Sequence, residues 1–206
     1  VLRNIDRTRF QIDFVVNRRH ENGYETEMEQ LGSKIYIIPK FKGVNYFEYI
    51  RRFNEVLDEG AYHIVHGHVS SSAVMYLKAA KLRGCVTIVH SHSAGYRGNV
   101  LERIIKRFFT AGAKWQADYW FSCSKLAAER LFGRKYATSN KYHYIPNAIV
   151  VEEYRFDESI RDRIRSDLGM SSTDVLYGHV GTFSTPKNHK FLIQVFKELY
   201  KKQGEK

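Results

Sequence analysis

Short apolar runs of strand length alternate with amphipathic stretches of helix length along most of the chain. Residues 34–38 (KIYII) form one such run, whereas residues 46–57 repeat apolar side chains at steps of three and four, which places them on one face of a helix. This alternation is typical of parallel strands joined by crossover helices. The pattern therefore predicts an α/β fold with a doubly wound parallel sheet.

The same pattern gives approximate bounds for each element. Strands are predicted at residues 11–17, 34–38, 61–65, 86–89, 119–123 and 141–145. Helices are predicted at residues 46–57, with Phe47, Ile50, Phe53 and Leu57 on the apolar face, and at 71–82, 100–115 and 126–132. These elements would nearly complete one domain.

The composition changes near residue 152. A charge-rich helical stretch follows at 152–169, then an expected strand at 174–180 (DVLYGHV), a loop, and an expected helix at 191–200. We therefore predict a first domain at 1–150, a helical connector at 151–170 and the start of a second domain at 171–206. Because the chain begins at Val1 with what resembles the last turn of a helix, we expect it to be a fragment.

The composition is that of a globular protein. Of the 206 residues, 43% are hydrophobic and 14% are aromatic, which is enough to bury a core and excludes intrinsic disorder. The chain has no apolar run of bilayer length and no secretory leader pattern, and its two cysteines form no disulfide framework. We expect reduced thiols and a cytoplasmic location.

Polar side chains follow the predicted strands at the points where the strands end. Because ligands bind beyond the carboxyl ends of parallel strands, this edge is the expected binding cleft. The residues concerned are His66, His68, His90, His92, Ser124, Asn147 and Gly181.

The two His-x-His pairs, 66–68 and 90–92, allow two interpretations. Imidazoles two residues apart on an extended segment face the same way and could bind a metal ion. They could instead be hydrogen-bonding residues at strand ends, with His92 donating to a phosphate or a sugar hydroxyl. Since neither pair has a carboxylate or thiolate motif beside it, we expect no metal.

Residues 181–187 (GTFSTPK) lie between the expected strand and helix of the second domain. Exposed backbone N–H groups and a helix N-terminus at such a position form an anion site, to which Lys187 could add a full charge. An ordinary turn with a solvated lysine would explain the segment equally well.

The chain carries a formal net charge of +11, and much of the excess falls within residues 97–141. In the predicted helix at 100–115, apolar Leu101, Ile104, Ile105, Phe108 and Phe109 lie beside Arg103, Lys106 and Arg107. A basic face beside apolar residues could meet an anionic membrane surface or nucleic acid, or could simply be solvated. The chain shows no recognisable nucleic-acid reading motif, so we expect no nucleic-acid partner.

Five segments in register resemble the GT-B glycosyltransferases of family 4, of the bacterial capsule and exopolysaccharide type. They are VHGHVSSSAVMYLKAAKLRG, VHSHS, FSCSKLAAERLFG, YIPNAI and GHVGTFSTPKNHKFLIQVF. The resemblance implies two facing Rossmann-like domains. The N-terminal domain would hold a saccharide or lipid-linked acceptor, and the C-terminal domain would hold a nucleotide diphosphate sugar. It also implies transfer with retention, no metal ion or other cofactor, and a peripheral position at the inner membrane face through the 97–115 region.

The resemblance assigns roles to three residues, and two others depart from the family pattern. His92 matches the histidine that faces the transferred sugar, Lys187 matches the cation that binds the donor diphosphate, and Gly181 opens the donor loop. Thr182 stands where the family usually has arginine, and Val150 where it usually has an acid. The family's Gly-rich first loop and its paired glutamates would lie outside residues 1–206, so we expect the fragment alone to be inactive. Two other classes stay open: a metal-dependent hydrolase that uses the His pairs, and a nucleic-acid-binding module.

Overall fold

The structure is a computed structural model that describes residues 1–20, 23–92, 100, 104 and 110–203. The chain divides into two compact units, Val1–Ala148 and Ile149–Lys206, and each is described by itself. The division falls close to the predicted end of the first domain. The roles expected of the two domains stay predictions.

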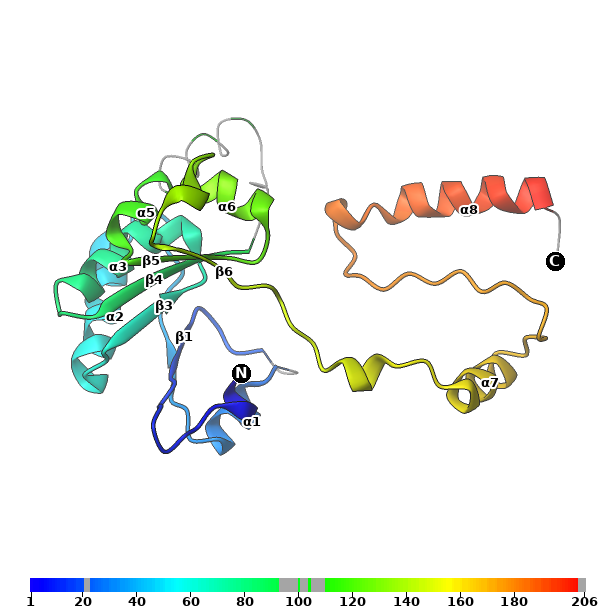
Figure 1. Cartoon of the computed structure of the whole chain (residues 1–206), viewed down its shortest axis with the longest axis horizontal. Coiled ribbons are helices and arrows are strands. Elements are labelled where there is room, and N and C mark those ends of the chain that lie inside the picture. Colours follow the sequence, from blue (N-terminus) through cyan, green and yellow to red (C-terminus); the bar gives the residue numbers. More distant parts are fainter. Residues whose placement is uncertain (21–22, 93–99, 101–103, 105–109, 204–206) are drawn as a thin grey trace. The chain divides into compact units, whose positions relative to one another are not determined.

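The first unit alternates strands and helices in the predicted order (Figure 1). Its strands are β1 (Phe14–Val16), β2 (Ile35–Ile37), β3 (Ile64–Gly67), β4 (Val86–Ser91), β5 (Tyr119–Ser122) and β6 (Tyr142–Tyr144). Its α-helices are α1 (Glu25–Gln30), α2 (Tyr46–Gly60), α3 (Ala73–Lys81), α5 (Ala113–Gln116) and α6 (Lys125–Phe132). Short 3₁₀ helices lie at η1 (Leu2–Asn4), η2 (Ser70–Ser72) and η3 (Tyr136–Thr138).

All the described strands pair in parallel. β3, β4, β5 and β6 form a four-stranded sheet in that order, and β1 pairs with β2. Because these strands are parallel, their carboxyl ends meet along one edge of the sheet. The α/β, Rossmann-like fold class expected from the sequence is confirmed.

The core lies between the four-stranded sheet and the helices that connect its strands. α3 and α5 pack against β4, and α6 packs against β5 (Figure 1). Val89 of β4 and Leu77 of α3 are completely buried, as are the small residues Ala73 and Ala80. Alanines at these positions let the helix backbone approach the sheet closely, which keeps the interior densely packed.

The β1–β2 pair shares this core with the larger sheet. Ile38, which follows β2, is 3% exposed and belongs to the same apolar cluster. The Tyr62 hydroxyl, before β3, donates a 2.5 Å hydrogen bond to the carboxylate of Asp13, before β1. Apolar packing at Ile38 and this charge-assisted hydrogen bond thus connect the two sheets.

The predicted apolar face of α2 is partly wrong. Phe47 is 86% exposed, while Tyr49 and Val56 are buried together with Phe53 and Leu57. The buried stripe is the one that packs against α3. The helix carries enough apolar residues for two overlapping stripes, so periodicity by itself could not select between them. Helix α1 was not predicted, because its sequence ETEMEQ offers only one apolar residue to define a period.

The helix expected at 100–115 lies largely outside the described residues, as do Leu101, Ile105, Phe108 and Phe109 on its expected apolar face. Ile104 is 60% exposed, and α5 forms the last part of the expected range. None of the helices that the structure describes is long and apolar enough to cross a bilayer.

The second unit is mainly helical. It contains η4 (Val151–Tyr154), α7 (Glu158–Asp167), η5 (Thr185–Lys187) and α8 (His189–Gln203). The expectation of a strand at 174–180 is wrong: these residues have no regular secondary structure, although the Tyr177 ring lies 5.8 Å from that of Phe196 on α8. A parallel strand exists only through ladder hydrogen bonds to a neighbour. Residues 149–203 contain no strand to serve as that neighbour.

Candidate functional site

Four histidines lie where β3 and β4 end. His66 and His90 are each the second-last residue of their strand, and His68 and His92 come directly after the strand ends. Side chains alternate along a strand, so residues two apart point to the same side. The two adjacent parallel strands therefore bring both His-x-His pairs to one side of the sheet at its carboxyl edge.

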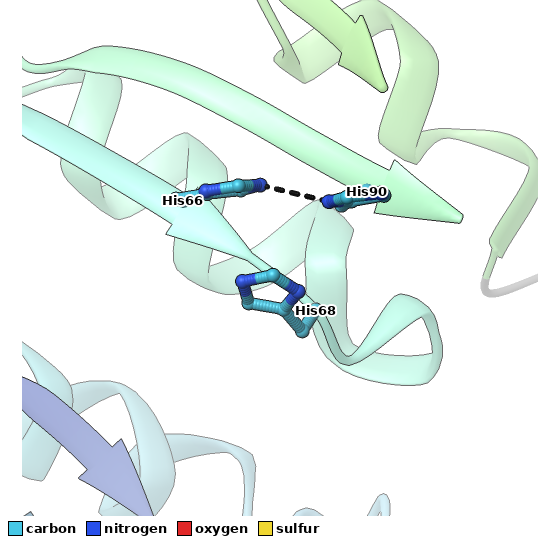
Figure 2. Close-up of side chains that lie close together, drawn as sticks. All are labelled: His66, His68 and His90. Carbon is cyan, nitrogen blue, oxygen red and sulfur yellow. Dashed lines mark hydrogen bonds between the residues drawn. The ribbon is translucent and has the colours of Figure 1, made fainter. Parts of the chain in front are cut away.

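The rings make hydrogen bonds between the two strands. Nε2 of His66 lies 3.2 Å from Nδ1 of His90, and Nδ1 of His68 lies 2.8 Å from Nε2 of His92. Figure 2 shows the rings of His66, His68 and His90 on the same side of the two strands. In each pair one nitrogen must carry the proton and the other must accept it, so each bond needs at least one neutral imidazole.

Rings on the same strand are also close together: the His90 and His92 rings are stacked, and those of His66 and His68 are tilted. The centroids of His90 and His92 are 4.0 Å apart, and those of His66 and His68 are 4.3 Å apart. The edge of this group meets Phe121 of β5, whose ring lies 5.4 Å from His66 and 5.9 Å from His90. Phe121 was not predicted from the sequence, because its place beside His90 depends on the register between β4 and β5.

The cluster favours neutral imidazoles. Burial lowers the pKa of His66 to about 4, assisted by repulsion from His68 and His92. Burial also lowers the pKa of His90 to about 4, followed by repulsion from the other three rings, while the backbone of Ile145 acts in the opposite direction. Burial lowers the pKa of His68 and His92 as well.

His66, His68 and His92 keep solvent exposure as whole residues, whereas His90 is 5% exposed. In the three exposed residues, the burial that disfavours the charged imidazole therefore acts at the part of the ring that faces the other imidazoles. The outward surface of the cluster stays accessible to a ligand.

Ser124 and Asn147 were also predicted to line this edge. The Ser124 hydroxyl accepts a 3.1 Å hydrogen bond from the backbone N–H of Ala127 and caps the N-terminus of α6. This cap is a structural role, and it accounts for the serine without a ligand. Asn147, which follows β6, is exposed.

The predicted donor loop belongs to the second unit. The Lys187 side chain crosses Gly181 so closely that a Cβ on Gly181 would lie 3.2 Å from Cδ of the lysine. The hydroxyls of Thr182 and Ser184 are 3.3 Å apart. The loop leads through η5 to the N-terminus of α8, where the unpaired N–H groups of a helix favour an anion.

The loop thus combines a lysine, two hydroxyls and a helix N-terminus, all exposed or half-buried. A side chain at Gly181 would require the lysine stem to shift by a few tenths of an ångström. Such a group of donors suits an anion such as a phosphate. The roles predicted for Gly181, Thr182 and Lys187 stay predictions.

Comparison with known protein families identifies the first unit. Residues 1–148 match the glycosyl transferase 4-like domain. The chain belongs to this family. The matched range coincides with the unit Val1–Ala148 that contains the histidine cluster. The resemblance to family 4 glycosyltransferases of the GT-B type, stated from the sequence motifs, is confirmed.

A curated relative supports this family assignment. The chain is 26% identical over 197 residues to the putative glycosyltransferase EpsF of Bacillus subtilis strain 168. The alignment covers 94% of this chain and 51% of EpsF. This glycosyl transferase 4-like chain thus spans about half the length of that relative.

Solved structures support the fold. The Anabaena protein HepE in complex with UDP has a structure similar to this chain, with a TM-score of 0.66 and 12% sequence identity. The similarity covers 92% of this chain and 58% of the HepE chain. For HepE in complex with UDP-glucose, the similarity covers 91% of this chain and 57% of the HepE chain, with a TM-score of 0.65 and 13% identity. At these identities the similarity is one of fold.

Proposed function

We propose that the protein transfers a sugar from a nucleotide diphosphate sugar to a saccharide or lipid-linked acceptor. The observation that carries this proposal is the match of residues 1–148 to the glycosyl transferase 4-like domain. It favours transfer over the metal-dependent hydrolase and the nucleic-acid-binding module that the sequence left open. The complexes of HepE with UDP and UDP-glucose make a uridine diphosphate sugar the donor to test first.

The proposed chemistry begins with departure of the nucleotide diphosphate, which builds negative charge on the leaving oxygen. Lys187, the loop N–H groups and the N-terminus of α8 are suitable stabilisers of this charge, because they are positive or carry positive partial charge. We propose that these groups take the place of a metal ion, that no cofactor is needed, and that the configuration at the anomeric carbon is retained.

His92 is the proposed catalytic residue of the first unit. Its pKa is lowered by burial, so at neutral pH the ring is uncharged and has one N–H to donate. A neutral donor suits a sugar hydroxyl or a phosphate oxygen near the reacting carbon. His68 and His90 contact it and set the orientation of its ring.

The proposed setting is the synthesis of a cell-surface polysaccharide at the inner face of the membrane, by a cytoplasmic or peripheral enzyme. The name of the B. subtilis relative, a putative glycosyltransferase, agrees with the activity. We expect peripheral attachment through the 97–115 region. Within that region, Trp115 is 68% exposed and the Lys114 ammonium lies 4.9 Å from its ring.

The proposed transfer is tested on the full-length protein. UDP-glucose binding is measured by calorimetry, and transfer is measured as release of UDP with a panel of lipid-linked and free saccharide acceptors. We expect saturable donor binding in chelator-containing buffer, with UDP release that depends on the acceptor. Absence of binding to every nucleotide sugar tried would contradict the proposal.

A further inference from the structure

The proposed transfer uses His92 and leaves the chemistry of the other three imidazoles unassigned. His66, His68 and His90 come from two neighbouring strands and form a group of potential metal ligands in the described part of the chain. Three imidazoles this close together suit one shared metal ion.

The distances suit a first-row transition metal ion. One ring nitrogen from each of His66, His68 and His90 lies within 4.8 Å of the others, and the closest pair, His66 Nε2 and His90 Nδ1, is 3.2 Å apart. Zn²⁺–N bonds of about 2.0–2.1 Å in a tetrahedral site put two ligand nitrogens about 3.3 Å apart. His68 is exposed, so its ring has room to rotate and bring the third nitrogen toward that separation.

The electrostatics also favour an ion of this class. Imidazole binds metals in its neutral form, and the groups that act on His66 and His90 keep both rings uncharged at neutral pH. Nitrogen ligands suit Zn²⁺, whereas Mg²⁺ prefers oxygen. The site therefore discriminates between these two ions by ligand type.

We propose that His66, His68 and His90 bind one Zn²⁺ ion, with a fourth position open to water or to an oxygen of a substrate. The proposed transfer does not require this ion, and the metal site is inferred from the geometry of the three histidines. An ion that takes Nδ1 of His68 displaces the hydrogen bond from this atom to His92. Zinc binding would thereby disturb the residue proposed to face the sugar, which makes the site inhibitory.

The first test is calorimetric titration with Zn²⁺ of protein purified without a polyhistidine tag and treated with EDTA. We expect one equivalent of Zn²⁺ to bind, and Mg²⁺ at the same concentration to give no heat of binding. Absence of zinc binding, or equal binding of both ions, would overturn the proposal.

Matched variants locate the ion. His66→Asn and His68→Asn should each weaken zinc binding at least tenfold, because each removes one of three ligands. His143→Asn is the control, since His143 lies on β6 of the same sheet with its ring 5.6 Å from Phe121, yet is not one of the three ligands. Circular dichroism confirms that each variant is folded. Should His66→Asn fail to fold, the exposed His68→Asn decides alone. Zinc affinity that is unchanged in the folded ligand variants would overturn the proposal.

Cobalt gives a readout independent of substitution. Co²⁺ bound by three imidazoles in a four-coordinate site should produce visible absorption that Zn²⁺ abolishes, and an octahedral, weakly absorbing spectrum would contradict the assigned geometry. UDP-glucose binding is measured separately in EDTA. Intact donor binding without zinc binding rejects only the metal site, and zinc binding without donor binding rejects only the proposed transfer.

Discussion

Nδ1 of His68 and Nε2 of His92 lie 2.8 Å apart and share one hydrogen bond across the ends of β3 and β4. His92 follows the last residue of its strand, so ladder hydrogen bonds do not restrain it directly. The contact with His68, and the stacking of its ring 4.0 Å from that of His90, orient the imidazole. His92 is therefore positioned by other histidines.

His92→Ala should lower the rate of sugar transfer about 100- to 1000-fold, the usual cost of losing one hydrogen-bond donor to a developing charge. The measurement is kcat with a UDP-sugar and an accepted saccharide. His143→Ala, a histidine on β6 of the same sheet, is the control and should leave the rate unchanged. Full activity and unchanged donor affinity in the His92 variant would show that the ring does not face the sugar.

Lys187→Ala should weaken binding of a nucleotide diphosphate sugar about 10- to 100-fold. A charge-assisted hydrogen bond to phosphate is worth about 1.5–3 kcal/mol, which corresponds to this change in Kd. Calorimetry with UDP-glucose measures the effect. Lys197→Ala removes an exposed lysine further along α8 and should leave donor affinity unchanged. If both variants bind equally well, Lys187 is an ordinary surface lysine.

Asp118→Asn should destabilise the first unit by about 1–2 kcal/mol at pH 7, a value reduced for partial exposure. Its carboxylate accepts hydrogen bonds from Lys81 and from the backbone N–H and hydroxyl of the buried Thr87. Burial alone would raise the pKa of Asp118, but these bonds outweigh burial and hold the pKa below its ordinary value of 3.8. Urea denaturation of the parent and the variant measures the difference.

The pH dependence of this contribution has a definite sign. Because the pKa of Asp118 is lower in the folded state, its contribution is fully present above the unfolded pKa and disappears as the pH falls through the folded one. The stability difference between parent and Asp118→Asn should therefore shrink below about pH 4. Asp58→Asn breaks a more exposed pair with Arg83 and should have a smaller effect at pH 7. A constant difference across this range would contradict the role of the carboxylate.

Tyr62→Phe should loosen the β1–β2 pair from the four-stranded sheet. The substitution removes the hydroxyl that donates to Asp13 and leaves the ring in place. We expect a loss of about 1–2 kcal/mol and faster hydrogen exchange at the backbone amides of β1 and β2. Tyr119→Phe, at a half-exposed position on β5, is the control. Unchanged exchange in β1 and β2 would mean that apolar packing through Ile38 is the main connection.

Attachment to vesicles should depend on anionic lipid and on salt. Each cation near such a surface contributes about 1 kcal/mol, and this attraction decays within the Debye length as salt is raised. Sedimentation with anionic and with neutral vesicles at two salt concentrations measures it. Trp115→Ala should weaken attachment, because an exposed tryptophan beside Lys114 suits the lipid interface. Equal and negligible binding to both vesicle types would mean that the basic face is merely solvated.

Local sequence determined most of the first unit. The apolar runs, their spacing and the residues that end them suffice to place the strands and most of the described helices of this unit, because burial of one face imposes a period of two or of 3.6 on the chain. The same reasoning put both His-x-His pairs at strand ends, and the family motifs that surround them were already legible in the sequence. The residue at which a strand ends depends on the local pattern, so it can be predicted without knowing which strand lies beside it.

Tertiary structure decided what those residues meet. That His66 bonds to His90, and His68 to His92, depends on the register between β3 and β4, which no local pattern specifies. The choice of Tyr49 and Val56 over Phe47 as the buried face of α2 depends on where α3 packs. The apolar pattern of residues 174–180 predicts a strand, but such a segment forms a strand only where another strand lies beside it. Strand pairing and helix packing are contacts between distant parts of the chain, and their energy exists only in the folded state.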